Sequence, residues 1–79
     1  MANDGGARRV LEELLSTTAI RQERWINQAE IGMTLVDFQI LHDLAEKWES
    51  SGRIEVLETQ VEQDTGKRLT LAIKFRRLE

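Results

Sequence analysis

The chain has 79 residues, of which 41% are apolar and 32% charged, and its formal net charge is -3. Because separate cores need roughly 100 to 200 residues each, these numbers favour one small domain and exclude most multidomain enzymes. The negative charge means that any binding to nucleic acid requires a local basic patch.

Residues 1–6 include Asn3, Asp4 and two glycines, so we expect a flexible leader followed by a single folded domain over residues 7–79. The leader lacks the basic run and the apolar stretch of a secretory signal. No apolar segment approaches the roughly 20 residues that span a bilayer, which predicts no membrane association. The absence of cysteine fits a reducing compartment. We therefore expect a cytoplasmic protein.

Helical spacing of apolar residues dominates the first part of the chain. Residues 7–15 place their apolar side chains on one stripe and predict a first helix. The hydroxyl cluster of residues 16–18 favours caps, so this helix is expected to end there, with a continuous helix as the alternative. In residues 19–30 the apolar spacing is again closer to helical than to alternating, which predicts a second helix.

A third helix is predicted from Thr34 to Ser51. Thr34 is followed three residues later by Asp37, a short-acid version of the capping box that opens helices. Gly52 stands where a left-handed residue ends a helix at little steric cost. The apolar face of this helix consists of Phe38, Leu41, Leu44, Ala45 and Trp48.

The last part of the chain changes from helical to alternating periodicity. Residues 68–76 alternate polar and apolar side chains, which predicts a strand buried on one side. Its expected partner, residues 53–62, shifts its apolar set from even to odd positions near Leu57, as a bulge requires. Asp64-Thr65-Gly66 is the turn between them. The predicted fold class is therefore α+β, with three helices followed by a C-terminal β-hairpin.

This order of elements resembles a winged helix-turn-helix DNA-binding domain over residues 7–78. Gly32 lies between two predicted helices, and the last helix runs through Gly52 directly into the hairpin. The apolar positions of the motif are occupied by Ile31, Met33, Phe38 and Leu41. The resemblance implies that the helix opening at Thr34 enters a DNA groove and that the hairpin acts as the wing.

Positive charge is concentrated at the end of the sequence. Residues 65–79 hold five bases and one acid, whereas residues 30–64 hold nine acids and two bases. Clustered lysine and arginine suit a phosphate backbone. The candidate contacts with double-stranded DNA are Lys67, Arg68, Lys74, Arg76 and Arg77 on the hairpin, and Arg21, Arg24, Gln39 and His42 on the preceding helices. We thus expect a small DNA-binding regulatory protein.

The same bases have a structural alternative. They could face Glu55, Glu58 and Glu62 on the neighbouring strand, because cross-strand pairs of opposite charge stabilise a hairpin by roughly 0.2 to 1 kcal/mol each. Lys67 and Arg68 are less easily explained in this way, since they lie at the turn.

Catalytic and metal-binding chemistry is not indicated. His42 is the only histidine, and a metal site around it would need several unrelated coincidences, so we expect a solvated helix residue. The sequence has no glycine-rich phosphate loop and no nucleophile motif. We expect no enzyme activity and no cofactor. Trp25 and Trp48 are expected in the core, with anchorage of a partner as the alternative.

A second function remains open at this point. The hairpin and the acidic helix face could instead serve a protein-interaction module, either a homodimeric adaptor or a small inhibitor. The apolar residues of the first strand cannot all be buried by a thin monomer, so some could pair with another subunit or invite strand addition. These possible interface residues are Ile54, Val56, Leu57 and Val61. We expect a homodimer under either reading.

Overall fold

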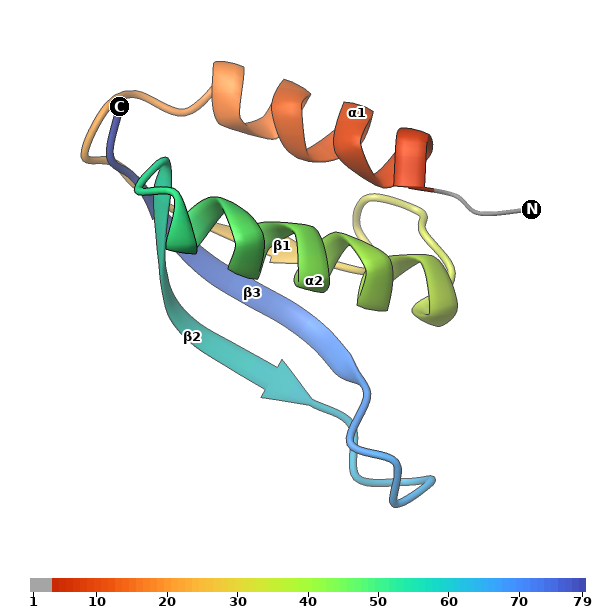
Figure 1. Ribbon diagram of the computed structural model, residues 1–79. Coiled ribbons are helices and arrows are strands. Elements are labelled where there is room, and N and C mark those ends of the chain that lie inside the picture. Colours follow the sequence, from red (N-terminus) through yellow and green to blue (C-terminus); the bar gives the residue numbers. More distant parts are fainter. Residues whose placement is uncertain (1–3) are drawn as a thin grey trace.

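Two helices cover one face of a three-stranded antiparallel sheet (Figure 1). The structure, a computed structural model, describes residues 4–79. Its elements in chain order are α1 (Asp4–Ser16), β1 (Glu23–Asn27), α2 (Leu35–Ser50), β2 (Ile54–Val61) and β3 (Thr70–Arg77). The sheet order is β1-β3-β2, so the last strand of the chain lies in the middle.

The predicted succession of three helices and a hairpin is wrong. The described residues contain two helices, and the segment 19–30, expected to be helical, forms a turn, strand β1 and further turns. Ile26 of β1 is 1% exposed and lies opposite Ile73 of β3. Pairing with β3 therefore overrides the local helical spacing, because a strand here completes the sheet and buries Ile26.

Helix α1 begins earlier than expected, at Asp4 rather than at Ala7. It takes in part of the expected leader, and residues 1–3 of that leader lie outside the described residues. The hydroxyl cluster ends the helix as predicted. The Ser16 hydroxyl donates to the Glu13 carbonyl at 2.8 Å, and the Thr18 hydroxyl donates to the Leu14 carbonyl at 2.7 Å. These side chains satisfy carbonyls that have no partner within the helix.

Helix α2 confirms the prediction for residues 34–51. The Thr34 hydroxyl accepts a hydrogen bond from the Asp37 N–H at 3.1 Å, which is the expected N-cap. Gly52 has a φ of +82° and reverses the chain immediately after the helix. The helix buries Phe38, Leu41, Ala45 and Trp48 against α1 and the sheet.

The predicted hairpin is also present, as β2 and β3. The register shifts between Val56 and Glu58, so Leu57 is the extra residue of the bulge that its sequence pattern predicts. Gly66 in the turn has a φ of +77°. The hairpin is not isolated, however, because β1 pairs with the other edge of β3.

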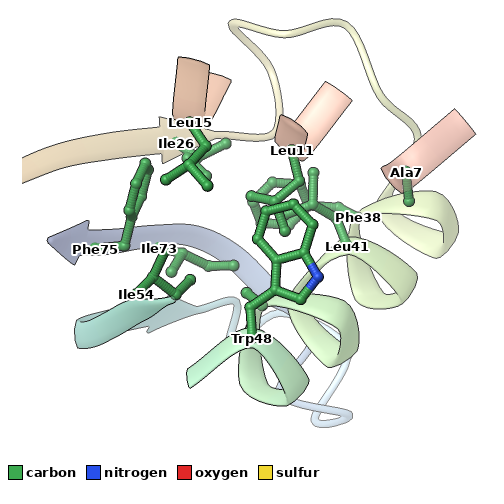
Figure 2. Packing of buried hydrophobic residues seen from close by; sticks show 11 residues of the cluster. Ala7, Leu11, Leu15, Ile26, Phe38, Leu41, Trp48, Ile54, Ile73 and Phe75 are labelled. Atoms are coloured by element: carbon green, nitrogen blue, oxygen red, sulfur yellow. The ribbon is translucent and has the colours of Figure 1, made fainter. Parts of the chain in front are cut away.

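One hydrophobic core lies between the helices and the sheet (Figure 2). Every element contributes to it, so no element is stable alone. Its fully buried members include Leu11, Phe38, Ile26, Ile54 and Phe75. Neither helix has the length and hydropathy of a membrane-spanning segment within the described residues.

Candidate functional site

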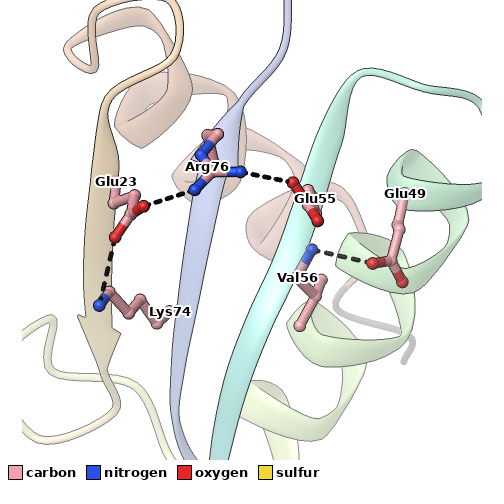
Figure 3. A network of polar contacts seen from close by, with 6 residues as sticks. All are labelled: Glu23, Glu49, Glu55, Val56, Lys74 and Arg76. Atoms are coloured by element: carbon pink, nitrogen blue, oxygen red, sulfur yellow. Dashed lines mark hydrogen bonds and ion pairs between the residues drawn. The ribbon is translucent and has the colours of Figure 1, made fainter.

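None of the described elements covers the face of the sheet turned away from both helices (Figure 1; Figure 3, which views this face with the helices behind). Strand register places on this open face the side chains of Glu23, Trp25 and Asn27 from β1, Glu55, Glu58 and Gln60 from β2, and Thr70, Ala72, Lys74 and Arg76 from β3. Side chains of successive residues alternate between the two faces of a sheet. Apart from Ala72 and the large aromatic ring of Trp25, these side chains are polar.

The charges on the open face neutralise one another (Figure 3). Glu23 forms ion pairs with Lys74 at 3.2 Å and with Arg76 at 2.6 Å, and Arg76 also reaches Glu55 at 2.8 Å. The hydrogen bonds from Arg76 and then Lys74 lower the pKa of Glu23, and the bond to Glu23 raises the pKa of Arg76. Two hairpin cations predicted to contact DNA thus have carboxylate partners within the chain.

Trp25 lies beside this network, and its expected place in the core is wrong. Its side chain is 42% exposed, and the Lys74 ammonium nitrogen is 6.0 Å from the ring centroid. Trp48 confirms the core prediction, since it is 4% exposed and the Arg53 guanidinium stacks 3.9 Å from its ring. Tryptophan is among the residue types most enriched at the positions that contribute most of the binding energy in protein interfaces.

Arg24 and Arg77, also predicted to contact DNA, point toward the end of α1. Arg77 donates from Nη1 to the carbonyls of Thr18 at 2.8 Å and Leu15 at 3.3 Å. Arg24 donates to the Thr17 hydroxyl at 2.6 Å and to the Leu14 carbonyl at 3.3 Å. Helix α1 has no basic residue of its own in its last turn, so these two cations cap the negative end of its dipole.

The two α2 residues among the predicted DNA contacts have different surroundings. The Gln39 amide bonds to the backbone of Thr70 on both its donor and acceptor sides, at 2.9 Å each. The His42 side chain is 20% exposed and lies 3.9 Å from Asp43 and 3.8 Å from Glu46. These three side chains bring their potential ligand atoms within 4.8 Å of one another, a grouping at i, i+1 and i+4 that the sequence analysis missed.

The turn between β2 and β3 projects beyond the body of the domain (Figure 1), and Lys67 and Arg68 belong to this turn. Both are exposed, as is Arg21 in the turn before β1. None of the three forms an ion pair with another described residue. The buried Glu62 carboxylate holds the tip in shape. It accepts hydrogen bonds from the Thr65 hydroxyl at 2.7 Å and the Thr65 N–H at 3.0 Å, and these bonds lower its pKa.

The possible interface residues of β2 fall into two groups. Ile54 is 1% exposed and Val56 packs against the same core, so both serve this chain's own interior. Leu57 in the bulge and Val61 at the strand end are half-buried. The structure thus leaves less apolar surface on β2 than its sequence suggests, and the large exposed ring is on β1.

Sequence reasoning missed the open face because it placed residues 19–30 in a helix. The cross-strand alternative did anticipate that the bases face acids: Arg76 meets Glu55, although Lys74 meets Glu23 of β1 and Glu62 bonds within the turn. No protein family model, no curated protein and no solved structure matches this chain.

Proposed function

We propose that this protein is a non-enzymatic protein-interaction module whose binding surface is the open face of the sheet. The observation that carries the proposal is Trp25, a large aromatic side chain that is 42% exposed on the open face, where it lies on the edge strand β1. Burying such a ring against a partner removes apolar area from water at roughly 25 cal/mol per Å².

Charge on the open face supports a protein partner over a polyanion. Binding to a phosphate backbone gains much of its affinity from cations that release counterions. Lys74 and Arg76 are already paired with Glu23 and Glu55, so a polyanion would compete with two carboxylates held in place. A protein surface with its own mixed charges can pair with this network without breaking it.

A photo-crosslinking amino acid at position 58 tests this proposal. Glu58 is exposed on the open face, and Glu46 is exposed on the outer side of α2, so position 46 is the matched control. In cells of origin, we expect covalent adducts with protein from position 58 and none of the same mass from position 46. Adding Trp25→Ala should remove the adducts.

Three results would contradict the proposal. One is that position 58 gives no protein adduct, and another is that it gives adducts with nucleic acid alone. The third is that the adducts survive Trp25→Ala unchanged. Mass spectrometry of the adducts distinguishes a second copy of this chain from a different protein.

A second candidate function is contact with duplex DNA through the hairpin tip, as expected for a small DNA-binding regulator. Its supporting observation is that Lys67 and Arg68 project from the domain without an ion-pair partner among the described residues. Two phosphate contacts correspond to a slope of about -2 in a plot of log affinity against log salt.

Titration of a mixed-sequence duplex at several salt concentrations tests this candidate. The double variant Lys67→Ala and Arg68→Ala should lose the salt slope, whereas Lys47→Ala, an exposed lysine on α2, should keep it. Equal affinity and slope in both variants would show that the tip does not contact DNA.

A further inference from the structure

Strand β1 presents unpaired backbone groups along its outer edge. At its two ends the Arg77 N–H donates to the Gln22 carbonyl at 3.1 Å and the Gln28 N–H donates to the Leu71 carbonyl at 2.9 Å. Antiparallel ladders alternate between residues that face the neighbouring strand and residues that face away from it. Even-numbered residues of β1 therefore bond to β3, and the N–H and C=O groups of residues 23, 25 and 27 face outward.

These outward groups have few partners within the chain. The Asn27 carbonyl accepts the Ile31 N–H at 3.2 Å, and a carbonyl has a second lone pair. No hydrogen bond to the backbone N–H or C=O of Trp25 or Glu23 occurs among the described residues beyond the sheet's own ladder. An edge of this kind is a template for pairing with another strand.

The opposite edge of the sheet, on β2, is protected. The Val56 N–H, which faces away from β3, donates to the Glu49 carboxylate of α2 at 2.9 Å (Figure 3). Two register shifts, between Val56 and Glu58 and between Gln60 and Val61, further interrupt this strand. Bulges and charged side chains are the usual devices that stop edge-to-edge pairing. Strand β1 pairs with β3 over five residues without a register shift, and no side chain of residues 4–79 accepts a hydrogen bond from its outward N–H groups.

We infer that a second copy of this chain pairs with the outer edge of β1, antiparallel and centred on Trp25. The inference rests on the proposed function, because pairing at this edge joins two open faces and brings their Trp25 rings together. The two three-stranded sheets then become one continuous sheet, in which the N–H and C=O groups of the two Trp25 residues bond to each other. The two indole rings become cross-strand neighbours on the open face, a pair that is favourable in sheets.

Charge and the length of β1 together favour this register. Centring on Arg24 places two arginines opposite each other, and centring on Ile26 leaves Glu23 opposite the turn that follows β1. Centring on Trp25 places Glu23 of one copy opposite Asn27 of the other, so no like charges meet and all three outward residues are used. Centring on Glu23 places two carboxylates opposite each other, and like charges directly opposite destabilise a strand pair. Centring on Asn27 leaves Trp25 opposite the turn that follows β1, where the ladder has ended.

Amide hydrogen exchange at two protein concentrations tests the inference on the unaltered chain. As sedimentation shows the dimer forming, exchange at residues 23, 25 and 27 should slow by about tenfold or more, because these amides become bonded. Residues 24 and 26 should be protected at both concentrations. A chain that remains monomeric at about 1 mM would overturn the inference, and so would a dimer in which the Trp25 amide exchanges as fast as in the monomer.

Charge reversal at the centre provides an independent test. Trp25→Lys and Trp25→Glu should each give a monomer, since like charges then meet across the two-fold axis, and an equimolar mixture should restore the dimer. Thr59→Lys on the exposed part of β2 is the matched control and should dimerise normally. Dimerisation of Trp25→Lys alone, or its loss in Thr59→Lys, would contradict the proposed register.

The experiments can contradict the strand pairing of β1 without contradicting the open-face binding surface, and the reverse. A strict monomer that still forms adducts with a different protein from position 58 removes the second copy and leaves the interaction surface intact. A dimer with the expected exchange pattern but no adduct with any protein from position 58 confirms the strand pairing and removes the open face as a binding surface.

Discussion

The side-chain amide of Gln39 pairs with both backbone groups of Thr70, one donor and one acceptor, each at 2.9 Å. The same amide nitrogen also donates to the Leu35 carbonyl at 2.9 Å. Gln39 therefore bonds to Thr70, at the start of β3, in the way that the backbone of a neighbouring strand would. It ties the N-terminal half of α2 to the central strand, at the point where the hairpin leaves the body of the domain.

Replacing this amide with a carboxylate should destabilise the fold. In Gln39→Glu the oxygen that replaces Nε2 faces the carbonyls of Thr70 and Leu35, and we expect a loss of about 1 to 3 kcal/mol in the free energy of unfolding at neutral pH. Urea denaturation measures it. Gln60→Glu, at an exposed position of β2, is the control. Equal stability of the two variants would mean that the Thr70 contact contributes nothing.

Arg77→Met should destabilise the protein without changing any binding to DNA. The variant keeps much of the side-chain volume but leaves the carbonyls of Leu15 and Thr18 without their donor. We expect a loss of about 1 to 2 kcal/mol, as for other charge-assisted bonds to a helix end. Thermal unfolding and duplex titration together check this. Unchanged stability with a lost salt slope would instead assign Arg77 to phosphate contact.

The turn of the hairpin should loosen in acid. Bonds from Thr65 hold the pKa of Glu62 below its ordinary value. A lowered folded pKa gives stability that is fully present above the unfolded value of about 4.3 and is lost as the pH falls through the folded value. We expect exchange of the Thr65 and Leu69 amides to accelerate over that range. Glu62→Gln should show fast exchange already at neutral pH, and an unchanged Glu62→Gln would contradict this role.

The two tryptophans should respond oppositely to replacement. Trp48→Ala removes a buried ring and should cost about 3 to 5 kcal/mol, whereas Trp25→Ala, at an exposed position, should change stability by less than about 1 kcal/mol. Acrylamide quenching of the single-tryptophan variants Trp25→Phe and Trp48→Phe checks the burial directly. Strong quenching is expected only where Trp25 remains. A protected Trp25 in the monomer would contradict its place on the open face.

Two glycines should respond oppositely to alanine. Gly52 has a φ of +82° and an added Cβ would meet nothing within 4 Å, so Gly52→Ala should cost about 1 to 2 kcal/mol through backbone strain alone. Gly6 lies inside α1 with equally open surroundings, and Gly6→Ala should stabilise by about 0.5 to 1 kcal/mol. Thermal melts measure both. A stabilising Gly52→Ala would be inconsistent with a left-handed residue at this position.

The elements predicted correctly are those whose signals are local. The Thr34 cap, the reversal at Gly52 and the bulge at Leu57 each depend on residues within a few positions of one another. Strand β1 could not be predicted in this way. Its structure comes from Ile73, nearly fifty residues away in the sequence, and its adjacent Trp25 and Ile26 fit neither simple period.

The candidate site was harder to predict than the fold, because it too depends on contacts between residues that are far apart in the sequence. Lysine and arginine side chains attract phosphate only when nothing nearer neutralises them. Sequence identifies Arg76 as a base but does not show that Glu23, on a strand expected to be a helix, lies against it. Arg77 likewise bonds to carbonyls near the end of α1, about sixty positions earlier.

The position of β3 in the chain has a consequence for synthesis on the ribosome. Strands β1 and β2 do not pair with each other, because β3 lies between them in the sheet. Neither strand can form its sheet hydrogen bonds until residues 70–77 have been synthesised. A nascent chain that has emerged only as far as Gly66 contains the two amphipathic helices and the two strands β1 and β2, which are still unpaired. It exposes apolar side chains that are buried once the domain has folded. Protection by a chaperone, or fast translation of the codons for residues 67–77, would matter most in that interval.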